Sequence, residues 1–474
     1  MGDIEKKRVV VIGTGVGGAA SAALMAHAGY QVTVLERNAI IGGKTAMTDR
    51  DGFTVDVAIH VSARGMKGPL GEVARLTNAD IEFIRKDPFG SFFYDSRFVE
   101  LTPNMHPISL YRIWKLLTPP LRALPGLVRF FAKLALGVKS EADVEAYRHV
   151  SAEEFIHSYT KDPDVCAFLD ACATLMFVLP TKEASTGEFL IALSDWFKSN
   201  GGAYPKGGFG QILIAYFEIC KQHGGEVLVN QEVKSIRIEN GHVTGVETED
   251  SVYDADIVLC NAGIQQTVAL AGRNNFSTDF LKQADTLTDS YGSIVMQYAL
   301  DYAPLNTTAG AYIPKHLSMS DIMSRQSAGE NTEENLLYFV MPSNADPSIA
   351  PPGKHLLLVG GVVPADMTDK DRNNQMIEIY DKQLRKLFPG FEKHVLWRQE
   401  RTVPFFKSLS GRSNGNAIGA AQSFKQSGGI RNTPRTPVPG LYVVGADTGG
   451  VGIGTELAAQ SAINAYKDIV KKRI

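Results

Sequence analysis

Cysteine is scarce in this sequence of 474 residues, and no two cysteines form a CxxC pair. The four that occur are Cys166, Cys172, Cys220 and Cys260. Their spacing matches no metal-ligand pattern and no disulfide framework, so we expect no bound metal and a reducing compartment. The polar N-terminus, MGDIEKKR, lacks the pattern of a secretory signal, and we therefore expect a cytoplasmic protein.

An excess of charge of either sign is also missing. The formal net charge of −3 gives no reason to expect a nucleic-acid partner. Hydrophobic residues make up 44% of the chain and charged residues 21%, which is typical of a globular protein. At this length the chain can bury two hydrophobic cores.

Residues 9–37 have the pattern of a strand, a glycine turn, a helix and a second strand. Four apolar residues, 9–12, run directly into Gly13-Thr14-Gly15-Val16-Gly17-Gly18. Gly13 would form the tight turn, and Gly15 would let the backbone approach a pyrophosphate. Gly18 would let a helix over 17–28 pack closely on the sheet, with its first N–H groups facing the phosphates.

Glu36 ends the second strand of this unit, roughly twenty residues after the turn, which is the interval at which an acid accepts hydrogen bonds from an adenosine ribose. A turn that needs glycine only for its geometry would leave Glu36 and its spacing unexplained. The unit therefore predicts a dinucleotide site, which NAD or FAD would fit.

The segment after Glu36 distinguishes FAD from NAD. It reads Arg37-Asn-Ala-Ile-Ile-Gly42-Gly43-Lys44-Thr45. Two glycines and a cation at this place resemble the second diphosphate-contacting segment of glutathione-reductase-type FAD enzymes, which NAD dehydrogenases lack. The resemblance implies cofactor contacts from Arg37 and from Gly42 to Thr45.

The end of the chain resembles the closing FAD motif of the same flavoproteins. A strand at 440–446 leads to Asp447, and a glycine-rich loop then leads to Glu456 and a helix of small residues. The resemblance implies that Asp447 meets the ribityl chain or the pyrophosphate of the flavin. It also implies that the backbone from Gly452 to Thr455 points a helix N-terminus at the pyrimidine side of the flavin. Further implied contacts are Val16, Gly17, Val233, Gly445 and Ile453.

Non-covalent binding of FAD is expected, because Ser427-Gly428-Gly429 is followed by Ile430 and not by the cysteine of a covalent flavin site.

The segment Asp51 to His60, DGFTVDVAIH, resembles the GFxFDxG segment of the carotenoid (phytoene) desaturase, carotenoid isomerase and retinol saturase family, with Ala58 in place of the usual glycine. In that family the segment runs towards the flavin.

Saturase-like members of this family carry a histidine at the position of His60. The resemblance therefore implies that His60 contacts FAD and acts as an acid or base. An ordinary hydrogen-bonded core histidine is the alternative. Glu456 is a second candidate for proton transfer if it faces the cavity.

The resemblance covers essentially the whole chain and implies an α/β fold. It consists of a glutathione-reductase-type, Rossmann-like FAD-binding domain and a substrate domain with a mixed or antiparallel sheet and a helical insertion. We assign residues 1–70, 201–272 and 400–474 to the FAD-binding domain, and 71–200 and 273–399 to the substrate domain.

Residues 101–140 contain no Asp or Glu, but they contain many apolar residues and six basic ones: Arg112, Lys115, Arg122, Arg129, Lys133 and Lys139. Prolines at 119, 120 and 125 divide the stretch into helices too short to span a bilayer, which takes about twenty apolar residues. On a helix that begins near Arg122, the side chains of Arg122, Arg129 and Lys133 would lie within roughly 40° of one another. A basic edge beside an apolar face suits an anionic membrane surface. A lid packed on its own domain is the alternative.

A second strand–GxGxxG–helix unit for NAD(P)H is absent from the sequence. We therefore expect hydride exchange between flavin N5 and a long apolar substrate, such as an isoprenoid, polyene or lipid, that desaturates, saturates or isomerises carbon–carbon double bonds. Quinone, oxygen or another redox partner would exchange electrons with the flavin. An amine oxidase shares both FAD motifs, but no aromatic cage can be assigned. A prenyl-binding protein of the same fold is the remaining alternative, although it has no use for a complete flavin site.

Overall fold

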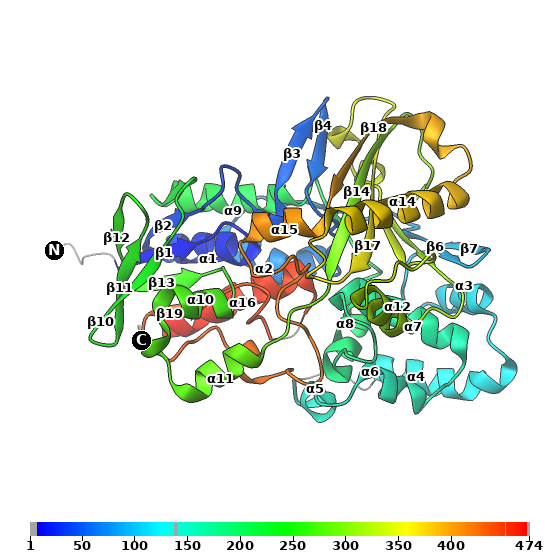
Figure 1. Cartoon of the computed structure of the whole chain (residues 1–474), viewed down its shortest axis with the longest axis horizontal. Coiled ribbons are helices and arrows are strands. Elements are labelled where there is room, and N and C mark those ends of the chain that lie inside the picture. Colours follow the sequence, from blue (N-terminus) through cyan, green and yellow to red (C-terminus); the bar gives the residue numbers. More distant parts are fainter. Residues whose placement is uncertain (1–6, 137–140, 451, 472–474) are drawn as a thin grey trace.

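The computed structural model describes residues 7–136, 141–450 and 452–471, and Figure 1 shows two sheets and a group of helices. The first sheet is parallel, with strand order β19-β13-β1-β2-β9. Its strands come from distant parts of the chain: β1 (Arg8–Ile12), β2 (Gln31–Leu35), β9 (Glu226–Leu228), β13 (Ile257–Cys260) and β19 (Leu441–Val443).

The predicted strand–turn–helix–strand unit is confirmed, with helix α1 at Val16–His27. Side chains alternate across β1, so Val9 and Val11 pack under α1, α9 (Gly210–Gln222) and α16 (Gly454–Lys471). Val10 and Ile12 face the other side, where they join a core with α10 (Ile264–Ala271) and a three-stranded sheet of β10 (Ser235–Glu239), β11 (His242–Glu247) and β12 (Val252–Asp254). Both faces of the parallel sheet are therefore covered, as a parallel sheet requires.

The second sheet has seven strands in the order β18-β14-β17-β16-β15-β6-β7. Its pairs are antiparallel except for β15 and β6, so the mixed sheet expected of the substrate domain is confirmed. Helix α14 (Lys370–Leu387) packs on one face of it. The strands are β6 (Gly90–Tyr94), β7 (Arg97–Leu101), β14 (Gly292–Leu300), β15 (Ala309–Ile313), β16 (Leu337–Val340), β17 (His355–Val363) and β18 (Val395–Arg401).

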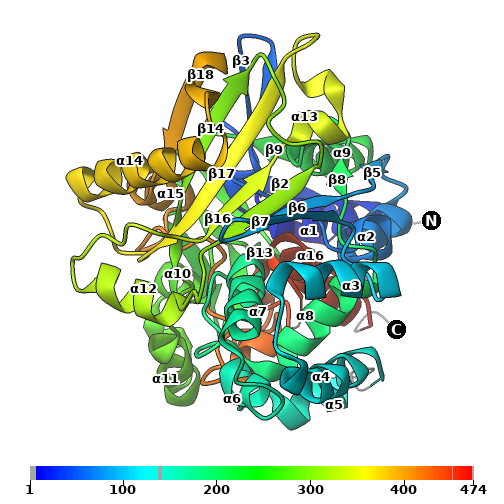
Figure 2. The same cartoon turned by 90° about the vertical axis from the view of Figure 1, so that its right-hand side faces the viewer.

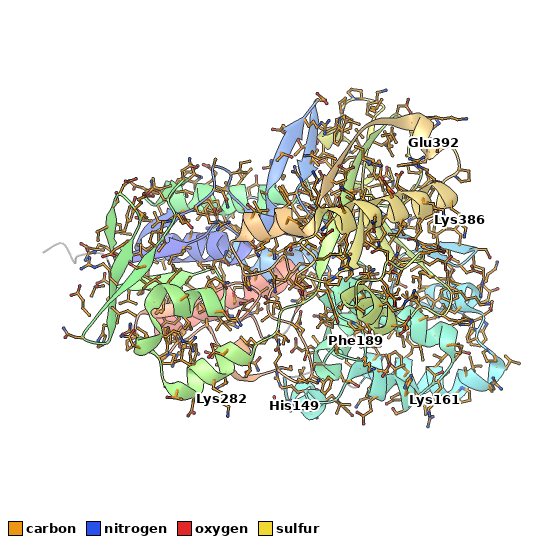
Figure 3. All side chains as sticks on the ribbon, viewed as in Figure 1. His149, Lys161, Phe189, Lys282, Lys386 and Glu392 are labelled. Carbon is orange, nitrogen blue, oxygen red and sulfur yellow. The ribbon has the colours of Figure 1, made fainter. Side chains whose placement is uncertain are left out.

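Below this sheet lies a group of helices that we call the helical cap (Figure 2). Its core is rich in aromatic side chains, and Figure 3 shows Phe189 inside it while Lys161 lies at its outer surface. At the start of one of these helices, Ser151 Oγ accepts a hydrogen bond from Glu154 N at 3.2 Å and caps the helix. The cap helices are α3 (Pro107–Leu117), α4 (Leu124–Leu136), α5 (Glu141–Tyr147), α6 (Ala152–His157), α7 (Pro163–Phe177) and α8 (Thr186–Lys198).

The basic stretch at 101–140 differs from prediction in one respect. Arg122 lies in a separate 3₁₀ turn, Leu121–Ala123, and α4 begins only at Leu124. The common helical face predicted for Arg122, Arg129 and Lys133 is therefore wrong, because the chain turns after the two prolines before the α-helix starts. Lys139 lies outside the described residues. Within the described residues, no helix is both long and apolar enough to cross a membrane.

The remaining named elements connect these layers or flank the site: β3 (Met47–Arg50), β4 (Phe53–Asp56), α2 (Pro69–Thr77), α11 (Thr278–Thr286), α12 (Met319–Ser327) and α15 (Val403–Ser410). The exact domain boundaries stay a prediction.

Candidate active site

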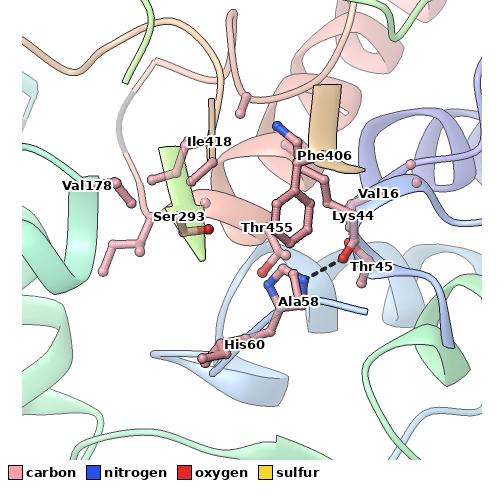
Figure 4. A pocket seen from close by; sticks show the side chains of 18 of the residues that line it. Val16, Lys44, Thr45, Ala58, His60, Val178, Ser293, Phe406, Ile418 and Thr455 are labelled. Atoms are coloured by element: carbon pink, nitrogen blue, oxygen red, sulfur yellow. Dashed lines mark hydrogen bonds between the residues drawn. The ribbon is translucent and has the colours of Figure 1, made fainter. Parts of the chain in front are cut away.

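A cavity of about 590 Å³ runs from the carboxyl edge of the parallel sheet to the helical cap. Figure 4 shows the part of it where Lys44, His60, Phe406 and Thr455 come together from separate segments. Ligands of α/β proteins bind at this edge of the sheet, and the volume lies within the usual range of ligand pockets, about 300–1,000 Å³.

The glycine turn forms one end of the cavity. Gly13 has a left-handed φ of +89°, and its N–H donates to Leu35 O at 2.8 Å. A Cβ on Gly18 would lie 2.0 Å from Gly13 O, so only glycine lets α1 pack this closely on the turn. Gly18 thus packs against the side of the turn that faces away from the cavity. The cavity itself is lined by Gly13, Gly15, Val16 and Gly17.

The start of α1 fits a pyrophosphate. Its N-cap residue, Gly15, has no side chain to accept from the first N–H groups, and its first turn contains no acidic residue. The first N–H groups of a helix have no partner within the helix, and they carry a partial positive charge. The turn therefore presents donors to the cavity in the arrangement that a diphosphate requires.

Glu36 lies at the cavity wall with its carboxylate held from both sides. Oε2 accepts from Thr14 N at 3.0 Å and from Thr14 Oγ1 at 2.5 Å, while Oε1 accepts from Asn38 N at 2.9 Å. Thr14 Oγ1 also accepts from Gly42 N, which ties the turn to the following segment. The residues predicted in that segment all line the cavity: Arg37, Gly42, Gly43, Lys44 and Thr45.

Asn261, which was not predicted as a site residue, joins the two FAD motifs. A Cβ on Gly17 would lie 2.7 Å from both Asn261 Oδ1 and Gly445 N, and a Cβ on Gly445 would also lie 2.7 Å from Asn261 Oδ1. The turn at the start of the chain and the loop near its end therefore meet around this amide. Its position directly after β13, at the carboxyl edge of the sheet, is the signal that could have identified it.

Asp447 does not reach the cavity wall, which differs from its predicted contact with the ribityl chain or pyrophosphate. Its Oδ1 accepts from Arg412 Nη2 at 2.9 Å and from Ala420 N at 2.9 Å, and its Oδ2 accepts from Ile264 N at 3.0 Å. Burial acts to raise the pKa of Asp447, but Arg412 and these hydrogen bonds outweigh it and hold the pKa below its usual value. The carboxylate instead positions Arg412, which lines the cavity and which no local sequence pattern indicated.

The other predicted residues of the closing motif divide between the wall and its support. Gly445, Ile453 and Thr455 line the cavity, as does Val233 from the loop before β10. Gly452 lies off the wall, where its carbonyl accepts from Gln422 Nε2 at 3.0 Å. This bond supports the loop before α16, and the predicted backbone contact of Gly452 with the cofactor stays a prediction.

His60 lines the cavity beside Lys44. Its Nε2 lies 3.0 Å from the backbone carbonyl of Lys44, and its ring contacts Phe209. A carbonyl oxygen only accepts, so Nε2 carries the proton and Nδ1 is left as the acceptor. Burial lowers the pKa of His60, which keeps the ring neutral near pH 7. The structure therefore gives His60 the form of a base and not of an acid.

Glu456 is buried and does not face the cavity, which corrects its prediction as a proton-transfer residue. Its Oε1 accepts from Ser62 Oγ at 2.7 Å and from Arg64 N at 2.8 Å, and its Oε2 accepts from Arg64 Nε at 2.8 Å. Its carboxylate fastens the start of α16 to the segment after β4. A carboxylate with this set of partners is a structural group.

We predict that Glu456→Gln lowers the free energy of unfolding by about 1–3 kcal/mol, because a buried charge-assisted bond to Arg64 is lost. The turnover of FAD-loaded protein is expected to change by no more than about twofold. Thermal unfolding and a turnover assay measure the two effects. A large loss of turnover at unchanged stability would restore the catalytic assignment.

The other end of the cavity, which we call the apolar arm, is lined by side chains of the cap and the seven-stranded sheet. Charged side chains on the described wall, Glu36, Arg37, Lys44, Glu232 and Arg412, belong to the flavin end. Burial raises the pKa of Cys172, on α7, to about 12, so its thiol stays neutral. The arm is formed by Phe92, Leu101, Ile113, Phe168, Cys172, Leu175, Met176, Leu193, Trp196, Phe197, Leu336 and Tyr338.

The chain is similar to known proteins over most of its length. The chain is 24% identical over 491 residues to a chloroplastic prolycopene isomerase from Daucus carota, with 92% of this chain and 75% of that protein covered. It is 25% identical over 497 residues to a zeta-carotene-forming phytoene desaturase from Myxococcus xanthus, with 95% and 92% covered.

Solved structures share the fold across almost the full length. An oxidoreductase from Methanosarcina mazei has a TM-score of 0.76 and 23% identity, covering 97% of this chain and all of that one. Putrescine oxidase bound to putrescine has a TM-score of 0.72 and 13% identity, covering 98% and 99%. The family model for flavin-containing amine oxidoreductases matches residues 16–470. The chain therefore belongs to this family, and it is an FAD-dependent oxidoreductase related to carotenoid desaturases and isomerases.

Proposed function

We propose that this flavoenzyme makes, removes or moves carbon–carbon double bonds in a long apolar substrate of the isoprenoid or polyene type. The observation that carries the proposal is the apolar arm, which continues from the flavin end of the cavity into the cap with no charged side chain on its described wall. A neutral hydrocarbon loses no hydrogen bonds on entering such a space, whereas a charged substrate would be desolvated without a partner. The curated relatives named above act on carotenoids according to their names.

The residues of the site supply orientation, exclusion of water and one base. FAD, when bound, supplies hydride exchange with carbon. Phe197 and Trp196, on α8, and Met176, on α7, form walls that keep water from the arm. Nδ1 of His60, which has no hydrogen-bond partner among the described residues, would take the proton that leaves the carbon chain when a double bond forms.

The direct test is to incubate FAD-loaded protein with polyenes carried in liposomes. Three conditions separate the possible reactions: aerobic, supplemented with quinone, and anaerobic with chemically reduced flavin. A shift of the polyene absorbance with a matching product on chromatography supports the proposal. Unchanged polyenes and an unchanged flavin spectrum under all three conditions would falsify it.

An amine oxidase remains the alternative within the same family. Amine substrates are cationic at neutral pH, and the described wall of the apolar arm has no carboxylate to pair with them. This observation favours an apolar substrate. Peroxide release with amines, and none with polyenes, would favour the alternative.

Cys172→Trp is expected to block the apolar arm, because the larger side chain would extend from α7 into space that a substrate occupies. We predict a fall in kcat/KM with polyenes of about tenfold or more, with FAD retained. Steady-state assays and the visible flavin spectrum measure both. The matched control is Cys172→Ala, which removes the thiol without filling the arm and should keep most activity. Equal activity of the two variants would place the substrate elsewhere.

The cap also carries the surface for which we propose contact with an anionic membrane. Five of the thirteen large apolar side chains that are exposed in the described chain fall between residues 108 and 128, and they stand among the basic residues of this stretch. Exposed apolar groups bordered by Lys and Arg are typical of peripheral membrane binding. The five are Ile108, Tyr111, Leu121, Leu124 and Val128.

Replacing both Leu121 and Val128 by Glu is expected to weaken binding to anionic liposomes by about tenfold or more, because apolar area is lost and negative charge is added. Their exposures are 78% and 61%, so the fold should not be disturbed. Liposome co-sedimentation measures the effect. The matched control replaces Val252 and Leu396, which are exposed on strands outside the cap, and should bind as the unmodified protein does. Equal binding by all three proteins would argue against this surface.

A further inference from the structure

Lys44 is held in an unusual position for a lysine. It follows the Gly42-Gly43 turn and lines the cavity, and its Nζ donates to Asn416 O at 2.5 Å and to Asn416 Oδ1 at 3.1 Å. Asn416 is fully buried, and its own amide donates to Asn414 Oδ1 at 2.8 Å, which keeps its Oδ1 turned towards Lys44. Both acceptors of Lys44 are neutral oxygens. An ammonium and a neutral amine can each donate two hydrogen bonds, so both forms satisfy them.

The carboxylates near Lys44, those of Asp289 and Asp447, form ion pairs with Arg412 and not with Lys44. Arg412, which follows α15, lies 2.9 Å from Asp447 and 3.7 Å from Asp289, on the segment before β14. In the part of the chain that the structure describes, no carboxylate lies within ion-pair distance of Lys44 Nζ. His60, after β4, is a further titratable neighbour, and burial lowers its pKa and keeps its ring neutral.

This arrangement fits a lysine that changes charge near neutral pH. Burial, and to a smaller extent Arg412, lowers the pKa of Lys44 to about 7, although Asp289 and Asp447 act in the opposite direction. Two-electron reduction of a bound flavin adds negative charge to the same cavity. A negative charge stabilises an ammonium more strongly in a closed, apolar space than in water.

We propose that Lys44 is a positioning residue whose charge follows the redox state of the bound flavin: a neutral amine beside oxidised FAD and an ammonium beside the reduced anion. The two electrons come from the substrate or from an added reductant. One proton from water goes to the flavin, and a second goes to Lys44 Nζ. By linkage, the protonated lysine in turn favours the reduced flavin. The inference depends on FAD binding and not on the proposed substrate.

The test is the pH dependence of the flavin midpoint potential, measured with dithionite and a reference dye from about pH 6 to about pH 9. Uptake of one proton with two electrons changes the reduction equilibrium tenfold per pH unit, which corresponds to about 29.6 mV. In the unmodified protein we expect a hundredfold change per pH unit, about 59 mV, above pH values near 7, because Lys44 takes up the second proton there. Below this range Lys44 is charged in both states and the dependence should become tenfold.

Two variants identify the group responsible. Lys44→Met removes the charge and Lys44→Arg fixes it, so both are expected to show a tenfold dependence above pH values near 7, where the unmodified protein shows the steeper one. Lys407→Met, at an exposed lysine on α15, is the control and should keep the steeper region. The proposal is overturned by a tenfold dependence of the unmodified protein at every pH, or by a hundredfold region that persists in Lys44→Arg. If Lys44→Met fails to retain FAD, the profiles of the unmodified protein and of Lys44→Arg still decide.

No polyene is needed for this measurement, so its failure is distinguishable from failure of the proposed function. A lysine that only anchors the diphosphate predicts a different result: weaker FAD binding in Lys44→Met, with the same tenfold dependence in all proteins. That result would overturn the proposal.

Discussion

Replacing Gly17 with alanine is expected to lower FAD affinity by about 100-fold, or about 2.8 kcal/mol, and to yield largely colourless protein. The added Cβ would lie 2.7 Å from Gly445 N and from Asn261 Oδ1, closer than real contacts allow. Because Gly445 and Asn261 are held by the parallel sheet and by Ser461, α1 must move away from the closing motif. Titration of apo-protein with FAD, followed by flavin fluorescence, measures the change.

Gly29→Ala is the matched control at the other end of α1. Gly29 has a φ of +86°, but nothing lies within 4 Å of an added Cβ. Alanine there should cost about 1 kcal/mol of stability through backbone strain and leave FAD affinity unchanged. If Gly17→Ala bound FAD as tightly as Gly29→Ala, the close approach of the two motifs would not be what holds the cofactor.

Breaking the ion pair between Glu188 and Arg431 is expected to cost about 3–5 kcal/mol of the free energy of unfolding. Both side chains are almost fully buried, with exposures of 0% and 1%, and Arg431 Nη1 lies 3.2 Å from Glu188 Oε1. Glu188→Gln keeps the shape but leaves the guanidinium of Arg431 without a negative partner. Denaturant unfolding measures the loss, and Asp285→Asn, in the exposed pair with Arg273, should show little change.

Glu188→Gln is also expected to disturb the flavin site. Glu188 Oε2 accepts from Gln422 Nε2 at 2.6 Å, and that nitrogen also donates to Gly452 O beside the cavity. A shift of Gln422 would loosen the loop that precedes α16. The double variant Glu188→Gln, Arg431→Met should recover part of the stability, because it removes both charges together. No recovery in the double variant would show that the hydrogen bonds of Glu188 matter and the ion pair does not.

The dinucleotide site followed from local spacing, whereas the choice of FAD over NAD and the fold class were expected from the family resemblance. Gly13, Gly15, Gly18 and Glu36 lie within one strand–turn–helix–strand unit, whose geometry depends on residues close together in the chain, so the spacing predicts how they are arranged. The mixed sheet was expected only through family resemblance. The short helices at 101–140 were expected from their prolines, but the 3₁₀ turn that separates Arg122 from α4 was not.

The sequence by itself determined that this protein has a dinucleotide site with a glycine turn, a terminal acid and a closing glycine-rich motif. Only the tertiary structure decided which carboxylates support that site and which groups face into it. The carboxylate of Asp447 forms an ion pair with Arg412, and that of Glu456 accepts a hydrogen bond from Ser62, 394 residues away. Both carboxylates therefore stabilise the fold. The hydrogen bond from Lys44 Nζ to Asn416 O likewise joins two segments that are far apart in the sequence. The chemistry of a buried charged group depends on the partners and the solvent exclusion around it, and these come from segments whose approach no local spacing encodes.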